Sequence, residues 1–384
     1  MVTEALPLTS ALRDYEGQAA NLLAEWRAGS EAALRFFHQH LPRMLEEKVR
    51  WLPRRLSREQ LRSMEFDMDD ARTAIARGYD FAGWDALAAF AEAIARRDPG
   101  VFPFECAVDA VVSGDAATLS GLLTENPDLV GARSTRVTHF DPPVHRATLL
   151  HYVAANGTEG YRQRSPPNAV EIAHILLEAG AEADAPASLY GGEVTTMTLL
   201  VSSVHPAKAG VQAALVDLLV SFGASPDGAG VGNGTPPVET ALAFGYREAA
   251  RALERHGAFL SLAAAAGLGR VDMVGDLLAG SDAEGRRRAL ALAVQAGEVE
   301  AARVLLDAGE DPNRFNPEGI HGHTPPIHQA VWAGHIEVVR LLVERGARLD
   351  IRDTIHGGTP LDWAEHGGRE EIAAYLRMIT GGGT

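Results

Sequence analysis

The chain has 384 residues, of which 46% are hydrophobic and 22% charged, and its formal net charge is −16. This composition is typical of a folded protein and excludes a largely disordered one, and the length suits two ordinary domains or one long repeat array. The acidic balance argues against a nucleic acid partner, because contacts to phosphates need clustered lysine and arginine.

Two short basic clusters lie at residues 43–62 and 286–288, and both are expected to be solvated helix faces. No apolar run has the length that a membrane-spanning helix needs, and the N-terminus lacks the basic-then-apolar order of a signal peptide. The sequence therefore predicts a cytoplasmic protein that makes no membrane contact.

Residues 1–98 are predicted to form a small helical N-terminal domain. Ser57 and Gln60 have the spacing of a capping box at the start of its third helix. Residues 99–103 are predicted to be a linker, because proline and glycine break the helical pattern there. Apolar residues recur with helical spacing over residues 11–26, 31–45, 58–77 and 81–96.

From residue 104 onward a unit of two short helices recurs, and its clearest copy covers residues 326–347. Pro326 begins the first helix, where its missing N–H costs nothing, Gly334 ends that helix, and Gly346 ends the second. This stretch resembles the ankyrin repeat, whose pattern reads TPLHxAAxxGHxxxVxxLLxxGAD. The matching residues are Pro326, His328, Ala330, Gly334, His335, Val339, Leu342, Gly346 and Ala347.

The resemblance implies an all-α fold, an ankyrin-type helix-pair solenoid with long hairpin insertions behind the small helical N-terminal domain. About eight repeats fit into residues 104–384. The segment 75–84 also looks like helical stretches found ahead of some bacterial ankyrin arrays, and its aromatic residues are expected to be core. Because each repeat buries apolar surface only against its neighbours, the leucines of the second helices are expected to be core as well, among them Leu305, Leu306, Leu341 and Leu342.

Several copies exceed the family's period of about 33 residues. A pure packing scaffold needs no such insertions, and repeat loops that lengthen on one edge usually build a binding face. The insertions fall near residues 133–147, 158–167, 185–197, 228–235 and 314–324.

In the family, the first helix and the hairpin of each repeat face the concave side of the solenoid. Aligning the copies on the glycine that ends each first helix places aromatic rings there, together with Asn, Gln and His side chains, and such a groove suits a peptide or a small organic ligand. The alternative is that the inserted hairpins fold back and bury the rings. The register of the third repeat stays open, because residues 195–204 admit two alignments. The candidate ligand-binding residues are Tyr152, Asn156, Tyr190, His205, Phe244, His321, His323, Gln329, Trp332, Asp362, Trp363 and His366.

Four histidines need separate interpretations. His151 and His328 stand at the histidine position of the TPLH motif, where the family's imidazole ties the hairpin backbone together, so a structural role is expected. His321 and His323 flank one glycine and could hold a metal ion with Asp311 or His356. The sequence supplies no firm third ligand, so we expect surface histidines and no metal site.

Asp362 and Glu239 replace the TPLH histidine in two repeats. A carboxylate at this position can accept hydrogen bonds from hairpin N–H groups, or it can be a desolvated general base that faces the groove. No catalytic motif identifies a reaction, and the chain lacks a nucleophile elbow, a phosphate-binding glycine loop and a metalloprotease pattern.

The resemblance implies recognition of a partner protein or peptide on the concave face, by a monomer that needs no cofactor. The alternative is a small-molecule-binding protein or an enzyme, with its site in the concave groove roofed by the long hairpins. The two hypotheses predict different surfaces: a broad open face with exposed rings, or one deep pocket that encloses them.

Overall fold

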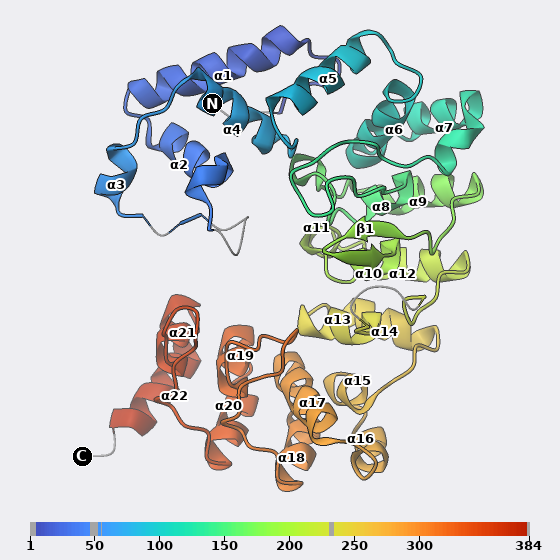
Figure 1. Ribbon diagram of the computed structural model, residues 1–384. Coiled ribbons are helices and arrows are strands. Elements are labelled where there is room, and N and C mark those ends of the chain that lie inside the picture. The colour runs from blue at the N-terminus through green and yellow to red at the C-terminus, as the bar shows by residue number, and fades with distance from the viewer. Residues whose placement is uncertain (1–4, 47–52, 55, 230–233, 382–384) are drawn as a thin grey trace. The chain divides into compact units, whose positions relative to one another are not determined.

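The computed structural model describes residues 5–46, 53–54, 56–229 and 234–381. The chain divides into two compact units: unit 1 consists of residues 1–211 and 231–233, and unit 2 of residues 212–230 and 234–384. Short helices make up most of both units, which confirms the all-α prediction (Figure 1). Within the described ranges, no helix is long and apolar enough to cross a membrane.

The N-terminal helices of unit 1 share one apolar core. Phe37 and Phe66 stack in it with ring centroids 4.2 Å apart. Tyr79 and Phe81 of segment 75–84 are buried there too, as expected, whereas the third aromatic residue, Trp84, packs against this core but is only half-buried. The helices are α1 (Leu12–Arg27), α2 (Glu31–His40), η1 (Pro42–Met44), α3 (Arg58–Arg62), α4 (Met68–Gly78) and α5 (Trp84–Ala95).

Two of these helices are shorter than predicted. The helix expected over 31–45 ends at His40, because the residue before Pro42 is extended and a residue that precedes proline disfavours the helical conformation. The helix expected over 58–77 is two helices, since Asp67 caps α4 by accepting a hydrogen bond from the N–H of Asp70. The capping box of Ser57 at the start of α3 is confirmed.

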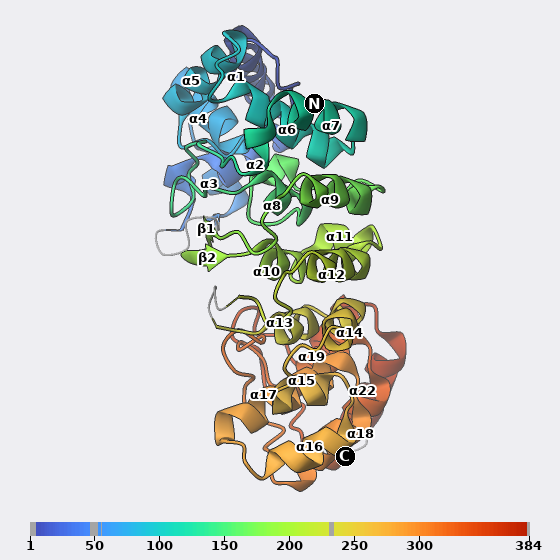
Figure 2. The same cartoon turned by 90° about the vertical axis from the view of Figure 1, so that its right-hand side faces the viewer.

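Three helix pairs follow. The third begins after Thr195, whose hydroxyl accepts a hydrogen bond from the N–H of Thr198, and this fixes the register that the sequence left open. Figure 2 shows the β1–β2 hairpin beside α10. The helix α6 already starts at Phe102, and the division at 98–104 stays a prediction. The elements are α6 (Phe102–Ser113), α7 (Ala116–Glu125), η2 (Pro127–Val130), α8 (Leu149–Val153), η3 (Gly160–Arg162), α9 (Ala169–Glu178), β1 (Ala187–Leu189), β2 (Gly192–Val194), α10 (Thr196–Leu200), α11 (Val204–Lys208) and, in unit 2, α12 (Gln212–Ser221).

The remaining five pairs build unit 2. Their first helices lie along the inner side of the curve in Figure 1 and their second helices along the outer side. The leucines expected in the core of the second helices, Leu305, Leu306, Leu341 and Leu342, are all buried. The pairs are α13 (Pro237–Ala243) with α14 (Arg247–Arg255), α15 (Leu262–Gly267) with α16 (Val271–Leu278), α17 (Ala283–Ala296) with α18 (Val299–Asp307), α19 (Pro326–Ala333) with α20 (Ile336–Glu344), and α21 (Pro360–His366) with α22 (Glu370–Gly381).

The insertion ahead of α19 reaches a distant repeat. A hydrogen bond of 2.8 Å from the N–H of Asn316 to the carbonyl of Thr324 closes this hairpin. At its tip, Nε2 of His321 lies 3.1 Å from the carbonyl oxygen of Ala243, at the C-terminal end of α13. The hairpin therefore joins the fourth and the seventh helix pairs, although a simple solenoid connects only neighbours.

The basic run at 286–288 is not the solvated face that the sequence predicts. Arg286 bonds to Glu310 at 3.0 Å, and Arg288 bonds to the buried carboxylate of Glu239 at 2.9 Å. Arg287 donates to the backbone carbonyls of residues 315 and 316, both at 2.8 Å. All three guanidinium groups hold parts of unit 2 together. The other basic cluster, 43–62, lies partly outside the described residues.

Candidate functional site

A pocket of about 610 Å³ lies between the seventh helix pair of the chain (α19 with α20) and the eighth (α21 with α22), both in unit 2. The helices α19 and α21, which lie side by side in Figure 1, form one part of its wall. The hairpins that precede these two helices form the rest. Seven of the twelve candidate residues line the pocket: His321, His323, Gln329, Trp332, Asp362, Trp363 and His366, together with His356, Gly357 and Gly358.

Two tryptophan rings shape the pocket. The rings of Trp332 and Trp363 stand nearly at right angles, at 76°, with centroids 5.9 Å apart. The ring of His366 stacks on Trp332 at 6.5 Å, and the ring of His323 tilts against Trp363 at 6.1 Å. Trp332 is 46% exposed, so much of its side chain remains in contact with solvent. An edge-to-face pair of this kind is a stable aromatic arrangement.

Asp353 holds Trp363 in place, and the sequence analysis did not identify it. Its buried carboxylate accepts hydrogen bonds from the indole N–H of Trp363 at 2.9 Å and from the backbone N–H groups of Ile355, His356 and Gly358. Burial alone would raise the pKa of Asp353, but these hydrogen bonds keep that pKa far below its ordinary value. A fixed negative charge therefore lies at the indole N–H edge of one of the two tryptophans that line the pocket.

Asp362 caps α21. Its Oδ2 accepts hydrogen bonds from the backbone N–H and the hydroxyl of Thr359, both at 2.8 Å. These bonds lower the pKa of Asp362, and the side chain is exposed. The carboxylate thus serves the hairpin, as one of the two predictions states, and the desolvated general base is wrong for this residue. Glu239 likewise pairs with Arg288 and accepts a hydrogen bond from Ser261 at 2.6 Å.

The histidine rings differ in their surroundings. His321 and His323 lie 6.1 Å apart between ring centroids, and burial, followed by the neighbouring His321, lowers the pKa of His323. The described part of the chain holds no group of three or more His, Cys, Asp and Glu side chains that could bind a metal ion. His328 is buried with Nε2 3.1 Å from the carbonyl of Gly358, and Nδ1 of His151 accepts from the N–H of Thr148 at 3.2 Å. Both contacts fit the expected structural role.

The other candidate residues lie outside this pocket. Tyr152 was expected on the solvated side but is only 1% exposed, because its ring packs against Phe104 of α6 and His145 of the 133–147 insertion. Asn156 donates to the carbonyl of Leu199 at 3.0 Å and accepts the hydroxyl of Tyr190, whose side chain is 72% exposed, at 2.7 Å. His205 is half-buried on α11 and Phe244 is 55% exposed after α13. Gln329 lines the pocket but is itself buried, with its amide bonded to Thr324.

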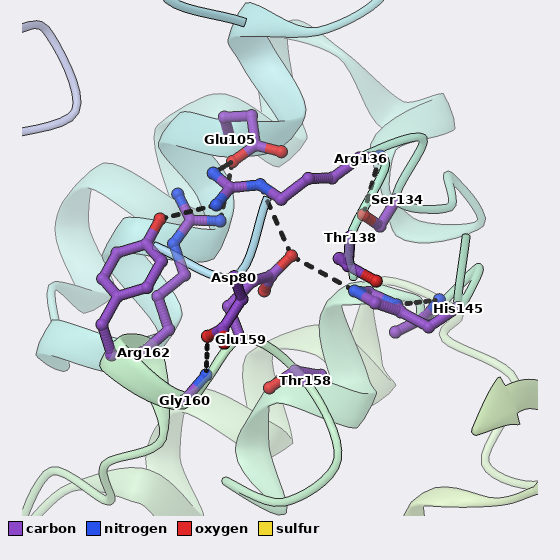
Figure 3. Close-up of polar contacts among 12 residues, drawn as sticks. Asp80, Glu105, Ser134, Arg136, Thr138, His145, Thr158, Glu159, Gly160 and Arg162 are labelled. Atoms are coloured by element: carbon purple, nitrogen blue, oxygen red, sulfur yellow. Dashed lines mark hydrogen bonds and ion pairs between the residues drawn. The ribbon is translucent and has the colours of Figure 1, made fainter. Parts of the chain in front are cut away.

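A second polar cluster, in unit 1, was missed by the sequence analysis. Figure 3 shows the guanidinium of Arg136 between Glu105 and Glu159, with N–O distances of 3.1 and 3.4 Å. Arg162 lies 2.7 Å from the same Glu105, and His145 lies 3.2 Å from Glu159. Although burial raises the pKa of Glu159, Arg136 and its other neighbours hold that pKa well below the ordinary value. We call these five residues the ion network.

The ion network joins the N-terminal helices to the first two repeats. The guanidinium of Arg136 lies over the rings of Phe81 and Phe90, at 4.5 and 4.3 Å from their centroids. Next to it, Asp80 accepts a hydrogen bond from the N–H of Gly160 at 2.6 Å. Because all its charged side chains are buried and paired, the network serves structure rather than ligand binding.

Lowering the pH from 7 to 5 is expected to destabilise unit 1. Burial lowers the pKa of His151 to about 4, partly opposed by backbone hydrogen bonds. The unfolded chain takes up this proton near the ordinary pKa of about 6.5. His151 should thus lower the free energy of unfolding by about 2 kcal/mol over this range, in addition to the fall that His40 causes, because burial lowers its pKa to about 4 as well. Urea unfolding at both pH values measures the loss, and His151→Gln should reduce it by about 2 kcal/mol. An equal pH slope in the variant would contradict the assignment, since only His40 and other groups would then cause it.

Comparisons with known proteins agree with this architecture. A family model for ankyrin repeats (3 copies) matches residues 260–353. The chain is 40% identical over 124 residues to human cyclin-dependent kinase 4 inhibitor B, a match that covers 31% of this chain and 87% of that protein. It is 37% identical over 122 residues to cyclin-dependent kinase inhibitor 2A of Monodelphis domestica, covering 31% and 69%. The mouse ankyrin repeat and SAM domain-containing protein 6 is 38% identical over 96 residues, covering 25% and 10%. The likeness of residues 75–84 to bacterial proteins stays a prediction.

Proposed function

This chain belongs to the ankyrin repeat family, a family of protein-interaction modules, and from that premise we propose that it binds a partner protein on the concave face of unit 2. The binding site in this proposal is the pocket between α19 and α21. A side chain of the partner enters the pocket, and the neighbouring residues of the partner lie along the inner helices.

The open corner of Trp332 and Trp363 is the observation that supports this site. Large aromatic side chains on a solvated face are costly unless something covers them, and tryptophan is enriched among the residues that carry most of the energy of protein interfaces. Trp363 is hydrogen-bonded to Asp353, and the ring of Trp332 packs against the rings of Trp363 and His366, so both rings lose little freedom when a partner binds.

The names of two relatives support a protein as the partner. Cyclin-dependent kinase 4 inhibitor B and cyclin-dependent kinase inhibitor 2A are by name inhibitors of kinases, which are proteins. The matched region covers most of each of these relatives, so an array of a few repeats accounts for most of those chains.

A small organic ligand is the second candidate. The volume of about 610 Å³ falls within the range of small-molecule sites, and the rings of the pocket offer the apolar lining that such sites have. An enzyme with its active site in this pocket has less support than a small-molecule-binding protein, because the carboxylate of Asp362 is exposed and caps α21.

Replacing Trp332 with alanine is expected to weaken binding of a partner peptide roughly 10- to 100-fold, as removal of a central interface tryptophan does. Peptides are first selected from a displayed random library on the full chain, and their dissociation constants are then measured with wild type and variant. The matched control is Phe259→Ala, which removes a ring that is 69% exposed elsewhere in unit 2 and should leave affinity unchanged.

The two variants separate the hypotheses. Equal affinity of wild type and Trp332→Ala for the selected peptides would show that binding occurs elsewhere. If no peptide is selected, but a metabolite stabilises the wild type against heat and fails to stabilise Trp332→Ala, the small-ligand candidate replaces the protein partner.

A further inference from the structure

We infer that the pocket between α19 and α21 takes a cationic side chain, an arginine or a lysine, so that the segment of the partner it recognises is basic. This inference rests on the proposed function and names the chemistry of its ligand. Three features of the pocket carry it: the orientation of the aromatic faces, the position of the carboxylates, and the kinds of residue that line the wall.

The two indoles form a corner that suits a positive charge. Their planes meet at 76° with centroids 5.9 Å apart, so one group placed in the corner meets more than one aromatic surface. Tryptophan is the best partner for a cation over its face, and the attraction grows when the site is partly desolvated. The stacked ring of His366 widens the aromatic wall beside Trp332.

The hydrogen bond of Trp363 strengthens this effect. Its indole N–H donates to the ionised carboxylate of Asp353 at 2.9 Å, and this contact pushes electron density into the ring. A ring richer in electrons attracts a cation over its face more strongly. The same bond holds the negative charge of Asp353 at the edge of this ring.

Asp362 supplies a carboxylate at the wall. Its three contacts, to the N–H and hydroxyl of Thr359 and to Arg352 at 3.6 Å, all use Oδ2. Within the described residues, Oδ1 has none of these contacts and is available to an incoming guanidinium or ammonium group. The pKa of Asp362 is lowered by the Thr359 hydrogen bonds, so the carboxylate is ionised at neutral pH.

The pocket has no basic lining residue. None of the ten is a lysine or an arginine, and the neighbouring Arg352 is engaged by Asp362 at 3.6 Å and by the carbonyl of Gly357 at 2.7 Å. Burial, followed by the neighbouring His321, lowers the pKa of His323, so that this ring stays neutral at pH 7.5. An anionic side chain would be repelled by the carboxylate of Asp362 at the wall, and the guanidinium of Arg352 is already paired with that carboxylate.

The charge of the whole chain favours the same partner. A formal net charge of −16 attracts basic segments and raises their rate of encounter, an effect that added salt weakens. The volume of about 610 Å³ also exceeds one side chain, so neighbouring residues of the partner fit beside the cation.

The test uses the full chain and two small probes that differ in charge. N-acetylarginine amide is titrated into ¹⁵N-labelled protein while the indole N–H signals are followed, and the signals of Trp332 and Trp363 are assigned with Trp332→Phe and Trp363→Phe. The neutral isostere N-acetylcitrulline amide is the second probe. We expect the arginine probe to shift both signals and the citrulline probe to bind at least roughly 10-fold more weakly.

Two variants test the role of the carboxylate. Asp362→Asn keeps the shape of the side chain but removes its charge, and it should weaken binding of the arginine probe roughly 3- to 10-fold. Asp276→Asn removes the same charge from the exposed surface of α16 and should change nothing, so it controls for net charge. Equal binding of the two probes, equal effects of the two variants, or no shift with the arginine probe would each overturn the inference.

The outcomes also separate the inference from the proposed function. If selected peptides need Trp332 but the arginine probe does not bind, the protein-binding site stands and its preference for cations is wrong. If the arginine probe binds in the pocket but no selected peptide does, the pocket is a site for a small cationic ligand and the protein partner is wrong.

Discussion

Replacing Arg136 with methionine is expected to lower the free energy of unfolding of unit 1 by about 3–5 kcal/mol. The side chain of Arg136 is fully buried, and its guanidinium neutralises Glu105 and Glu159. Methionine keeps the apolar contacts to Phe81 and Phe90 but leaves an uncompensated negative charge in the interior. Urea unfolding followed by near-ultraviolet circular dichroism measures the loss.

Two further variants make this expectation specific. Arg13→Met removes an arginine whose side chain is 86% exposed on α1, and it should change stability by less than about 0.5 kcal/mol. Adding Glu159→Gln to Arg136→Met removes one charge of each sign, so the double variant should cost less than the sum of the two single variants. Additive costs would show that the ion network does not act as a unit.

Replacing Leu342 with alanine is expected to cost about 2–5 kcal/mol and to unfold the end of the array first. Leu342 is fully buried on α20, which packs between α18 and α22. The eighth pair packs on the seventh, α21 against α19 and α22 against α20, so a cavity beside α20 loosens both pairs. Amide hydrogen exchange should accelerate in α19 to α22 and much less in α13 to α15.

Leu342→Ala should also weaken the binding of any ligand in the pocket, since α19 and α21 form part of the pocket wall. Glu344→Ala on the same helix replaces an exposed side chain and is expected to leave exchange and stability within about 0.5 kcal/mol of the wild type. Uniform acceleration across all of unit 2 in Leu342→Ala would mean that the unit unfolds only as a whole.

The helix pairs could be predicted from sequence because their signals are local. Pro326, Gly334 and Gly346 mark helix ends by their own backbone preferences, and the apolar spacing between them fixes which side is buried. The leucines of the second helices were placed correctly for the same reason. The helix over 58–77 was predicted too long because Asp67 reads as one more polar residue until its capping bond is seen.

The ion network could not be predicted because its members come from different elements. Arg136 and Glu159 lie in two insertions, and Glu105 lies on the first helix of the first repeat, where a charge normally indicates exposure. The same insertions bury Tyr152, which alignment to the family placed on the solvated side. Helical periodicity predicts which side of its own helix a residue occupies, but it does not predict whether a long loop packs over that residue and buries it.

The candidate site was predicted in part. The pocket residues on α19 and α21 gather because alignment on the end of each first helix places them on the same side of neighbouring repeats, whereas His321 and His323 come from the inserted hairpin before α19. Asp353 was missed because its partner Trp363 belongs to the next helix, and a carboxylate in a hairpin reads as a turn residue.

The hydrogen bond between His321 and Ala243 has a consequence for how this part of the chain can evolve. Arrays in which each repeat touches only its neighbours can gain or lose a whole repeat without harm to the others. One repeat added between α13 and α19 would move the tip of the hairpin by about 8–10 Å, the spacing of packed helices, and His321 would no longer reach its carbonyl. An added repeat would also separate Arg288 of the sixth pair from Glu239 of the fourth if it stood between them, so these contacts beyond neighbouring repeats act against a change in repeat number here.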